Sequence, residues 1–388
     1  MKIAGIIAEY NPFHKGHAYH IQRTRELSGC DYVVVCMAGH FTQRAEPACM
    51  SKWARVRMAL SCGADAVFEL PTMFTVRPAD AFARGGVHIL ADLGVDLLSF
   101  GSETEDMSLL RTLAGLRAEE PQELSLRIRE KLDAGMSHAR ARGEAVGEYL
   151  GMDPSLLNQP NLILAAEYLR AMKSRRPDME ALAVRRLGDY HDAALGEYAS
   201  ASAIRAAFSQ GNVFEALQCI PEAAWPYARP DALHSMDDIL MFRLRSMPLS
   251  EMAALPDMGE GLEHRLYRLC RETSGRESLL EAMKCRRYTR ARLSRLLLHA
   301  LLQIRQADLA AYPEPGYLRL LGVRREAKPL LRELSRRACR PMISVGMHLR
   351  DDACFALECR ATDLWALLHD APEARLPGRE YTEKFVQI

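Results

Sequence analysis

The sequence predicts an α/β protein in which a doubly wound parallel sheet forms the first half and a mainly helical region follows. Two observations support this prediction. Up to about residue 210, short β-branched apolar runs alternate with stretches of helical periodicity, which is the pattern of parallel βαβ units. Beyond residue 210 the alternation stops, and prolines punctuate a series of short helical patterns. We therefore expect two regions, residues 1–210 and residues 211–388.

The chain should open with a strand, a turn and a helix. Residues 2–8 form a short apolar run that ends in turn residues, which favours a strand over a buried helix. The pair Asn11-Pro12 marks the turn, because proline biases the residue before it away from the helical conformation. From Lys15 the apolar residues recur on one helical face, and this helix should end near Gly29.

The remaining strands of the first region follow at regular intervals. We expect strands at 32–37, 66–70, 95–100 and 181–184, and helices at 51–62 and 78–93. In a doubly wound sheet the carboxyl ends of the parallel strands meet at one edge, where ligands bind. Gly101, directly after one strand, lies at this edge. This glycine either lets a nucleotide approach the backbone closely or is needed only for the bend of the chain from the strand into the turn.

Two histidines lie at the start of the first helix. His14 and His17 are three residues apart on one side of a helical turn, and Gly16 between them allows close approach to the backbone. Anions collect at such a helix start, so the two rings could donate hydrogen bonds to phosphate oxygens and stabilise charge that develops during nucleotidyl transfer. Two alternatives stay open, a pair of ordinary surface histidines and a metal site.

Further candidate ligand residues occur later in the first region. Ser200 and Ser202 stand at a helix start ahead of Arg205, where small hydroxyls and a guanidinium could bind the phosphates and the leaving pyrophosphate. A plain serine N-cap is the alternative. Asn161 follows Pro160 at the start of an apolar helix, where it would by itself be an N-cap.

Composition favours a soluble cytoplasmic protein. The 388 residues are 48% hydrophobic and 26% charged, and the apolar runs end well short of the ~20 residues that a membrane span needs. The start of the chain has none of the regions of a signal peptide. The ten cysteines include no CxxC pair, which argues against a zinc knuckle or a disulfide framework. We therefore expect no membrane association and no metal held by the protein.

The net charge of +1 conceals an uneven distribution. Residues 282–350 contain sixteen Lys or Arg and four Asp or Glu, an excess of twelve positive charges, while the remainder is acidic. We favour contact with an RNA backbone over a merely solvated surface. The candidate residues lie in two basic segments: Arg287, Arg290, Arg292, Arg295, Arg324, Arg325 and Lys328. Tyr288 and Tyr317 could stack on bases or pack in the core.

The string from Gly5 to His17 resembles the HxGH signature of the nucleotidyltransferase superfamily, in particular that of the tRNA(Met) cytidine acetate ligases. Further blocks of that family recur in order along nearly the whole chain, at residues 43–47, 63–71, 100–103, 160–161, 186–192, 200–205 and 287–290. The resemblance implies a Rossmann-like nucleotidyltransferase domain over residues 1–210 and a basic tRNA-binding region over residues 211–388. It implies that acetate and ATP, with Mg²⁺, form acetyl-adenylate. The acetyl group would then pass to N4 of the wobble cytidine of elongator tRNA(Met), giving N4-acetylcytidine.

The resemblance also implies the roles of individual residues. His14, His17 and Arg205 would be catalytic. The ATP contacts would be Ile7, Ala8, Glu9, Tyr10, Asn11, Pro12, Phe13, His14, Lys15, Gly16, His17, His20, Gly101, Asn161, Arg186, Ser200 and Ser202. The polar residues Tyr190, His191 and Asp192 would shape the loop that follows Arg186.

The chain departs from the family pattern in one loop, and other activities remain open. His40 and Ala45 stand where the family usually has asparagine and glycine, so the loop 39–47 is expected to differ in shape. No dinucleotide GxGxxG, Walker lysine loop or HExxH occurs, which argues against hydride transfer and P-loop chemistry. The alternatives are a small-molecule adenylyltransferase that uses the same site and a non-catalytic RNA-binding protein.

Overall fold

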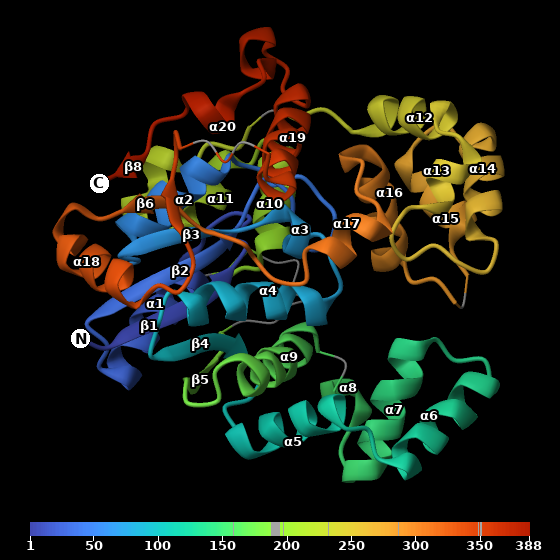
Figure 1. Cartoon of the computed structure of the whole chain (residues 1–388), viewed down its shortest axis with the longest axis horizontal. Helices are drawn as coiled ribbons and strands as arrows, with labels where there is room; N and C mark the ends of the chain where they lie inside the picture. Colours follow the sequence, from blue (N-terminus) through green and yellow to red (C-terminus); the bar gives the residue numbers. More distant parts are fainter. Residues whose placement is uncertain are drawn as a thin grey trace.

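A single sheet forms the centre of this computed structural model, which describes residues 1–157, 159–187, 195–196, 198–231, 233–285, 287–347, 349 and 351–388. Within these ranges eight strands pair in the order β5-β4-β1-β2-β3-β6-β7, and β8 pairs with β6 (Figure 1). The strands are β1 (Ile3–Ala8), β2 (Tyr32–Ala38), β3 (Ala66–Leu70), β4 (Leu97–Ser102), β5 (Glu180–Arg185), β6 (Leu318–Val323), β7 (Met342–Ser344) and β8 (Val386–Gln387).

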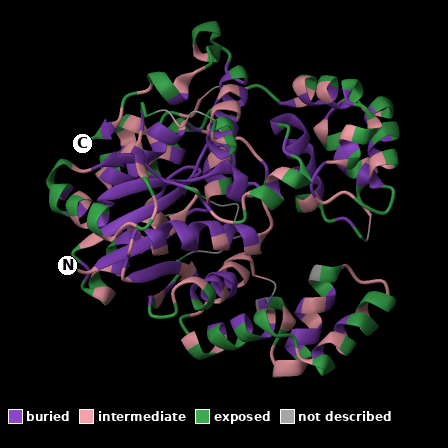
Figure 2. Ribbon diagram, viewed as in Figure 1, coloured by how far each residue is buried: buried purple, intermediate pink, exposed green. Residues whose placement is uncertain are grey.

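The first five strands are parallel, as the sequence predicts. Helices cover both faces, so alternate residues of a central strand enter two different cores. In β2, Val34 and Cys36 pack into one core, whereas Val33, Val35 and Met37 pack into the other. The buried residues accordingly follow the sheet and the inner sides of its helices (Figure 2). The expected α/β fold class is confirmed.

Helices of the first half connect these strands. They are α1 (Lys15–Ser28), α2 (Lys52–Ser61), α3 (Thr72–Thr75), α4 (Ala79–Asp92), α5 (Met107–Ala118), α6 (Gln122–Asp133), α7 (His138–Leu150), α8 (Pro154–Leu157) and α9 (Pro160–Arg175). The amphipathic helix α4 packs along α9 on one face of the sheet. The helices α5 to α8 extend outward from α9 as a first arm (Figure 1).

The second half begins as a series of short helices, as expected. They are α10 (Ala201–Ser209), α11 (Val213–Gln218), η1 (Glu222–Tyr227), α12 (Asp237–Ser246), α13 (Leu249–Ala253), α14 (Leu262–Glu272), α15 (Arg276–Met283), α16 (Arg290–Leu302) and α17 (Gln306–Ala311). The helices α12 to α16 pack on one another as a second arm, on the same side of the molecule as the first (Figure 1). No described helix is long and apolar enough to cross a membrane.

The last part of the chain returns to the sheet, which the sequence did not indicate. The strand β6 pairs antiparallel with β3, and β7 and β8 pair with β6. Around them lie η2 (Arg325–Ala327), α18 (Lys328–Arg337), α19 (Ala353–Leu367), η3 (Pro372–Arg375) and α20 (Arg379–Thr382). Residues 318–388 thus complete the sheet of the first half. The division into two domains at residue 210 stays a prediction.

A buried network of charged side chains holds this returning segment in place. The carboxylate of Glu69 on β3 and that of Glu380 on α20 lie 2.7 Å and 2.6 Å from the guanidinium of Arg319 on β6. Lys52 on α2 contacts the same two carboxylates. All four side chains are fully buried. Arg319 belongs to the basic segment 282–350 that was expected to contact RNA, and its position in the core removes it from any such surface.

Candidate active site

The turn between β1 and α1 brings the polar residues of the HxGH string to the edge of the sheet. Tyr10 has a φ of 51°, and the Asn11-Pro12 peptide bond is cis, so the chain reverses within a few residues. The side-chain oxygen of Asn11 accepts a hydrogen bond from the backbone N–H of Cys49 at 2.8 Å, which ties this turn to the loop after β2. His14 then caps α1.

The two histidines are held by backbone hydrogen bonds that fix their tautomers. Nδ1 of His14 accepts from the backbone N–H of Gly16 at 3.1 Å, and Nδ1 of His17 accepts from the backbone N–H of His14 at 3.2 Å. The ring centroids lie 3.7 Å apart. A neutral ring whose Nδ1 accepts carries its proton on Nε2. Each ring therefore presents an N–H donor at its far end.

Both imidazoles are neutral at pH 7. Burial, with a smaller contribution from the charge of Arg186, lowers the pKa of His14 to about 3. Burial and the neighbouring His14 hold the pKa of His17 well below its ordinary value. The ordinary surface histidines considered above are therefore not what the fold contains. In the described part of the chain, no group of three or more metal-ligating side chains occurs either.

A cleft of about 250 Å³ lies in front of these rings. It is formed by the end of β1, the loop after β2, α4, the end of β4, α9 and the start of α10. Fourteen of the expected site residues line it: Ile7, Ala8, Glu9, Tyr10, Asn11, His14, His17, His20, Gly101, Asn161, Arg186, Ser200, Ser202 and Arg205. The sequence thus located most of this cleft.

Four expected ATP contacts do not line the cleft. Phe13 is fully buried in a core cluster, and Pro12 is buried in the turn. The backbone N–H of Lys15 donates to the carbonyl of Cys219 at 2.9 Å. Gly16 lines a small adjoining pocket, and a Cβ there would meet the His14 ring at 2.9 Å, so this glycine makes room for the histidine.

The start of α10 lies beside the HxGH turn. Nη1 of Arg205 donates to the backbone carbonyl of Asn11 at 2.7 Å, and Nη2 lies 3.8 Å from Glu46. The Ser200 hydroxyl accepts from the N–H of Ala203 at 3.2 Å, which makes it the N-cap of α10. Ser200 is therefore a cap that also lines the cleft, so the two interpretations of this serine do not exclude one another.

Asn161 is not an N-cap, contrary to the expectation from its position after Pro160. Gln159 occupies the N-cap of α9, and Asn161 lies within the helix. Its side-chain nitrogen donates to Glu103 at 2.8 Å, and its oxygen lies 3.5 Å from Nη1 of Arg186. The three side chains form a chain of polar contacts along the cleft wall. The predicted loop cluster at Tyr190, His191 and Asp192 lies outside the described residues.

Some residues of the cleft were missed by sequence reasoning. They are Ile6, Thr42, Gln43, Arg44, Glu46, Phe82, Phe100, Pro160, Leu164, Ala201 and Tyr168. The backbone N–H of Gln43 donates to Glu9 at 2.6 Å, and burial raises the pKa of that carboxyl. The block 43–47 was a usable signal for this loop. Ile6, Phe100, Pro160 and Ala201 also lie in segments that resemble the family. Phe82, Leu164 and Tyr168 gave no signal, because their pattern is that of core residues.

The two departures in the loop 39–47 have different consequences. His40 is fully buried, its Nδ1 lies 3.0 Å from the Thr362 hydroxyl, and its ring lies against Trp53 and Trp365. It therefore belongs to the packing between the loop and α19. Ala45 has a φ of 60°, a left-handed conformation that glycine adopts without strain. The loop thus keeps a glycine-like backbone at a position that alanine occupies.

The seven basic residues expected to bind RNA do not form one surface. Arg324, Arg325 and Lys328 precede or begin α18, on the opposite side of the molecule from α16 (Figure 1). The others lie in or just before α16. Ion pairs neutralise part of this set, since Arg287 lies 3.1 Å from Glu260, Arg290 lies 3.1 Å from Glu281, and Arg324 lies 3.8 Å from Asp65.

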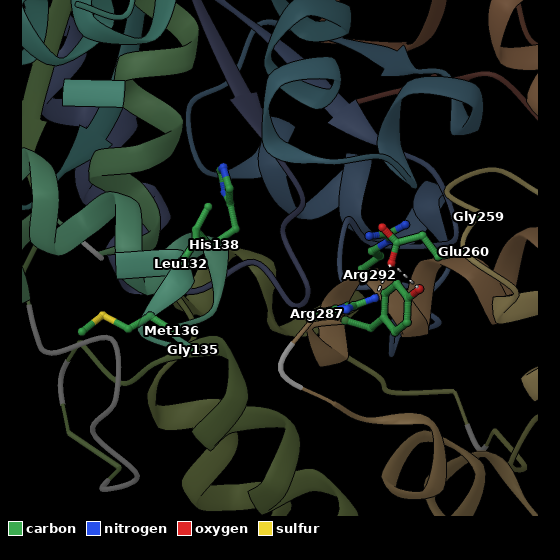
Figure 3. Close-up of a pocket in the computed structure, with 9 residues that line it drawn as sticks. Leu132, Gly135, Met136, His138, Gly259, Glu260, Arg287 and Arg292 are labelled. Atoms are coloured by element: carbon green, nitrogen blue, oxygen red, sulfur yellow. Dashed lines mark hydrogen bonds and ion pairs between the residues drawn. The ribbon is translucent and has the colours of Figure 1, made fainter. Parts of the chain in front are cut away.

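The two tyrosines are both buried, and they differ in place. Tyr317 packs in the core against Phe355. Tyr288 lines a cavity of about 610 Å³ between the α6–α7 turn and the start of α16. Figure 3 shows His138 and Leu132 on one side of this cavity and Arg287 and Arg292 on the other. The two arms therefore enclose a space with a basic wall.

Known proteins resemble the chain over its whole length. A model of the HIGH nucleotidyl transferase family matches residues 1–379. The tRNA(Met) cytidine acetate ligase of Thermoanaerobacter sp. (strain X514) is 35% identical and aligns over 100% of both chains. The protein of that name from Bacillus subtilis (strain 168) is 37% identical, over 96% of this chain and 94% of its own.

Solved structures agree with the sequence relatives. The crystal structure of Thermotoga maritima TmcAL in its apo form I has a TM-score of 0.91 to this chain at 28% identity, with 100% of both chains covered. Form II of the same protein, bound with alpha-thio ATP, has a TM-score of 0.89 and covers 100% of this chain and 99% of its own. The chain therefore belongs to the HIGH nucleotidyl transferase family and, within it, to the family of the tRNA(Met) cytidine acetate ligases.

Proposed function

We propose that this protein is an ATP-dependent ligase that forms acetyl-adenylate from acetate and ATP and then acetylates N4 of the wobble cytidine of elongator tRNA(Met). One observation carries the proposal. Two neutral imidazoles stack at the start of α1 with their Nε2–H groups unused by the backbone, in a cleft that Arg205 and two serines also line. Such donors suit a triphosphate whose charge shifts during reaction.

In the first half-reaction an acetate oxygen attacks the α-phosphorus of ATP, and the bond from that phosphorus to the bridging oxygen breaks to release pyrophosphate. Negative charge grows on the phosphate oxygens as this happens. His14 and His17 stabilise that charge as neutral donors, and Arg205 binds the departing pyrophosphate. The α-thio ATP bound in the Thermotoga maritima TmcAL structure supports the assignment of a nucleotide to this cleft.

In the second half-reaction the N4 amine of cytidine attacks the acetyl carbonyl carbon. AMP leaves with the electron pair of the broken anhydride bond, and the amine loses one proton. An exocyclic amine is a poor nucleophile, so prior activation of acetate as a mixed anhydride is chemically necessary. The names of the relatives, which specify tRNA(Met), cytidine and acetate, support this substrate choice.

Mg²⁺ fits the cleft as an ion that enters with the nucleotide. Mg²⁺ in phosphoryl-transfer sites is commonly held by substrate phosphates with one or two carboxylates, and Glu9 and Glu46 line this cleft. When bound, the ion would neutralise charge on the pyrophosphate. We propose a cytoplasmic location, because ATP, acetate and mature tRNA meet there.

Pyrophosphate release in the absence of RNA tests the first half-reaction. Purified protein with ATP and Mg²⁺ should release pyrophosphate only when acetate is added, and a quench should recover acetyl-adenylate. Release that requires a phosphate ester in place of acetate would identify the alternative small-molecule adenylyltransferase. No release with either partner, together with retained RNA binding, would identify a non-catalytic RNA-binding protein.

A further inference from the structure

The second arm contacts the sheet region along an arginine-rich interface between α16 and the segment from Val76 to α4, which we call the seam. Nε2 of His299 on α16 lies 2.7 Å from the backbone carbonyl of Val76, just before α4. Arg295 and Arg292 precede His299 by one and two helical turns and share its face of α16. Across the seam, Arg77 follows Val76 in sequence, and Arg84 lies on α4. We name Arg77, Arg84, Arg292 and Arg295 the seam arginines.

The seam arginines lack ion-pair partners among the described residues, although the guanidinium of Arg292 lies over the ring of Tyr288 at 4.9 Å. None forms an ion pair within 4.0 Å with a described acidic residue. The Nε atom of each is buried and has no hydrogen-bond partner, and the same is true of Nη1 of Arg77. Among them, Arg292 alone has a hydrogen bond to described protein, from Nη2 to the carbonyl of Asp257 at 2.6 Å. Buried donors without acceptors cost free energy, which an incoming acceptor would recover.

The charges around the seam also favour the binding of an anion. Burial lowers the pKa of Arg77, and the charge of Arg84 adds to this effect. Burial likewise lowers the pKa of Arg295, with the carboxylates of Asp257 and Asp80 opposing. Asp80 and Asp257 act on both Arg77 and Arg295, so the four half-buried guanidinium groups of the seam outnumber these two carboxylates and leave an excess of positive charge. An anion of charge −1 or −2 would balance it.

One of the seam arginines, Arg292, borders the cavity between the two arms. Arg292 lines that 610 Å³ cavity together with Arg287 and His138, and Figure 3 shows Arg292 at its wall. The seam is separate from the nucleotide cleft, since no seam arginine lines the latter. A ligand that enters between the arms therefore meets Arg292, outside the cleft assigned to ATP.

We propose that the seam arginines bind a backbone phosphate of the RNA substrate, so that Arg77 and Arg84 of the sheet region and Arg292 and Arg295 of the second arm share one phosphodiester. The proposal rests on the proposed function, which supplies an RNA substrate. Guanidinium groups match phosphate oxygens in geometry, and a phosphate contact positions RNA without reading its sequence. The site assigns Arg77 and Arg84 to RNA binding, although neither belongs to the basic segment 282–350.

The salt dependence of tRNA binding tests this site. Arg77→Gln, Arg84→Gln and Arg295→Gln should each weaken binding and reduce the slope of log affinity against log salt by roughly 0.7 to 0.9 for each phosphate that the variant no longer neutralises. The double variant Arg84→Gln/Arg295→Gln should bind only slightly more weakly than either single variant, because both act on one phosphate. Arg84→Lys should recover part of the affinity, since it restores the charge.

Arg268→Gln is the matched control, because Arg268 is an exposed arginine of the second arm that pairs with Glu272. It removes the same charge and should leave the slope unchanged. Inorganic phosphate, added as a competitor at constant ionic strength, should weaken wild-type binding more than that of Arg84→Gln.

The outcomes separate this proposal from the proposed function. Wild-type slopes in all three seam variants, in a protein that acetylates tRNA, would overturn the phosphate site alone. An equal slope change in Arg268→Gln would overturn it as well, because the effect would then be one of net charge. Folded variants with a reduced melting temperature and unchanged tRNA binding would show that the seam is structural. Absence of tRNA binding and acetylation in the wild type would overturn the proposed function instead.

Discussion

Two groups of buried cations in this protein differ in their partners. In the network behind the sheet, Lys52 and Arg319 each contact the carboxylates of both Glu69 and Glu380, and nothing in that network reaches solvent. In the seam between α4 and α16, the seam arginines are half-buried, and none has a carboxylate within ion-pair distance among the described residues. Arg319 of the network and Arg292 and Arg295 of the seam come from the same basic segment, residues 282–350.

This difference indicates that the charges of the network stabilise the fold, whereas those of the seam are available to bind a ligand. The network connects β3, β6, α2 and α20, so its ion pairs fix a segment that joins the sheet from more than two hundred residues away in sequence. A desolvated charge is tolerated there because each cation has two carboxylates within ion-pair distance. In the seam, the residues that the structure describes supply no carboxylate within ion-pair distance. The predictions below test this distinction, from the largest expected effect to the smallest.

Breaking the network should have the largest effect on stability. Arg319→Met leaves Glu69 and Glu380 with one cation instead of two, and removal of one partner from a buried pair typically costs about 3–5 kcal/mol. Urea unfolding measures this destabilisation. Arg336→Met, at an exposed arginine of α18 paired with Glu333, is the control and should change stability little. A destabilisation below about 1 kcal/mol in Arg319→Met would contradict the role given to the network.

The two histidines of the candidate active site form a third group, and they carry no charge. His17→Ala removes one Nε2–H donor from the cleft, so acetyl-adenylate formation should slow by about 10²-fold or more, while tRNA affinity stays near that of the wild type. The matched control is His264→Ala, at an exposed histidine of the second arm. Wild-type rates of acetyl-adenylate formation in His17→Ala would remove the two imidazoles from the mechanism.

A buried carboxyl at the edge of the network should make stability depend on pH. Burial, and next the charge of Glu69, raises the pKa of Glu358 in the folded protein. Above about pH 4.3 the unfolded chain has released this proton whereas the folded protein still holds it, so the free energy of unfolding falls as pH rises through this range.

Glu358→Gln removes this proton. The variant should therefore gain stability relative to the wild type as pH rises from about 4.3 to neutrality, which thermal unfolding at several pH values measures. Glu373→Gln, at an exposed glutamate of η3, should show no such trend. A constant difference between Glu358→Gln and the wild type across pH would show that Glu358 is ionised in the fold.

Neutralising the seam should have the smallest effect on stability. Arg84→Gln removes a cation that repels its neighbours and lacks an ion-pair partner, so the free energy of unfolding should change by less than about 1 kcal/mol. Urea unfolding in the same buffer as for Arg319→Met makes the two comparable. A destabilisation as large as that of Arg319→Met would mean that the seam arginines hold the fold after all.

The parts of this molecule that sequence could predict are those in which local pattern and three-dimensional position coincide. The alternating strands and the turn before α1 followed from apolar periodicity and from the proline of the Asn11-Pro12 pair. The strand β6 was hidden, because Arg319 within it looks like a surface residue until Glu69 and Glu380 are brought to it by the fold. Nothing in the sequence indicated that Arg77 and Arg84 lie near the basic helix α16. Only the contact between His299 and Val76 in the fold places them opposite it.

The most direct test of the central claim is mass spectrometry of nuclease digests of total tRNA after incubation with the protein, ATP, Mg²⁺ and acetate. N4-acetylcytidine should occur at the wobble position of elongator tRNA(Met) and be absent from initiator tRNA(Met), because an unpaired anticodon base can be turned out and read on its edge. Isotope-labelled acetate should supply the acetyl group. Equal labelling of both tRNAs, or labelling from acetyl-CoA but not from acetate with ATP, would contradict the account.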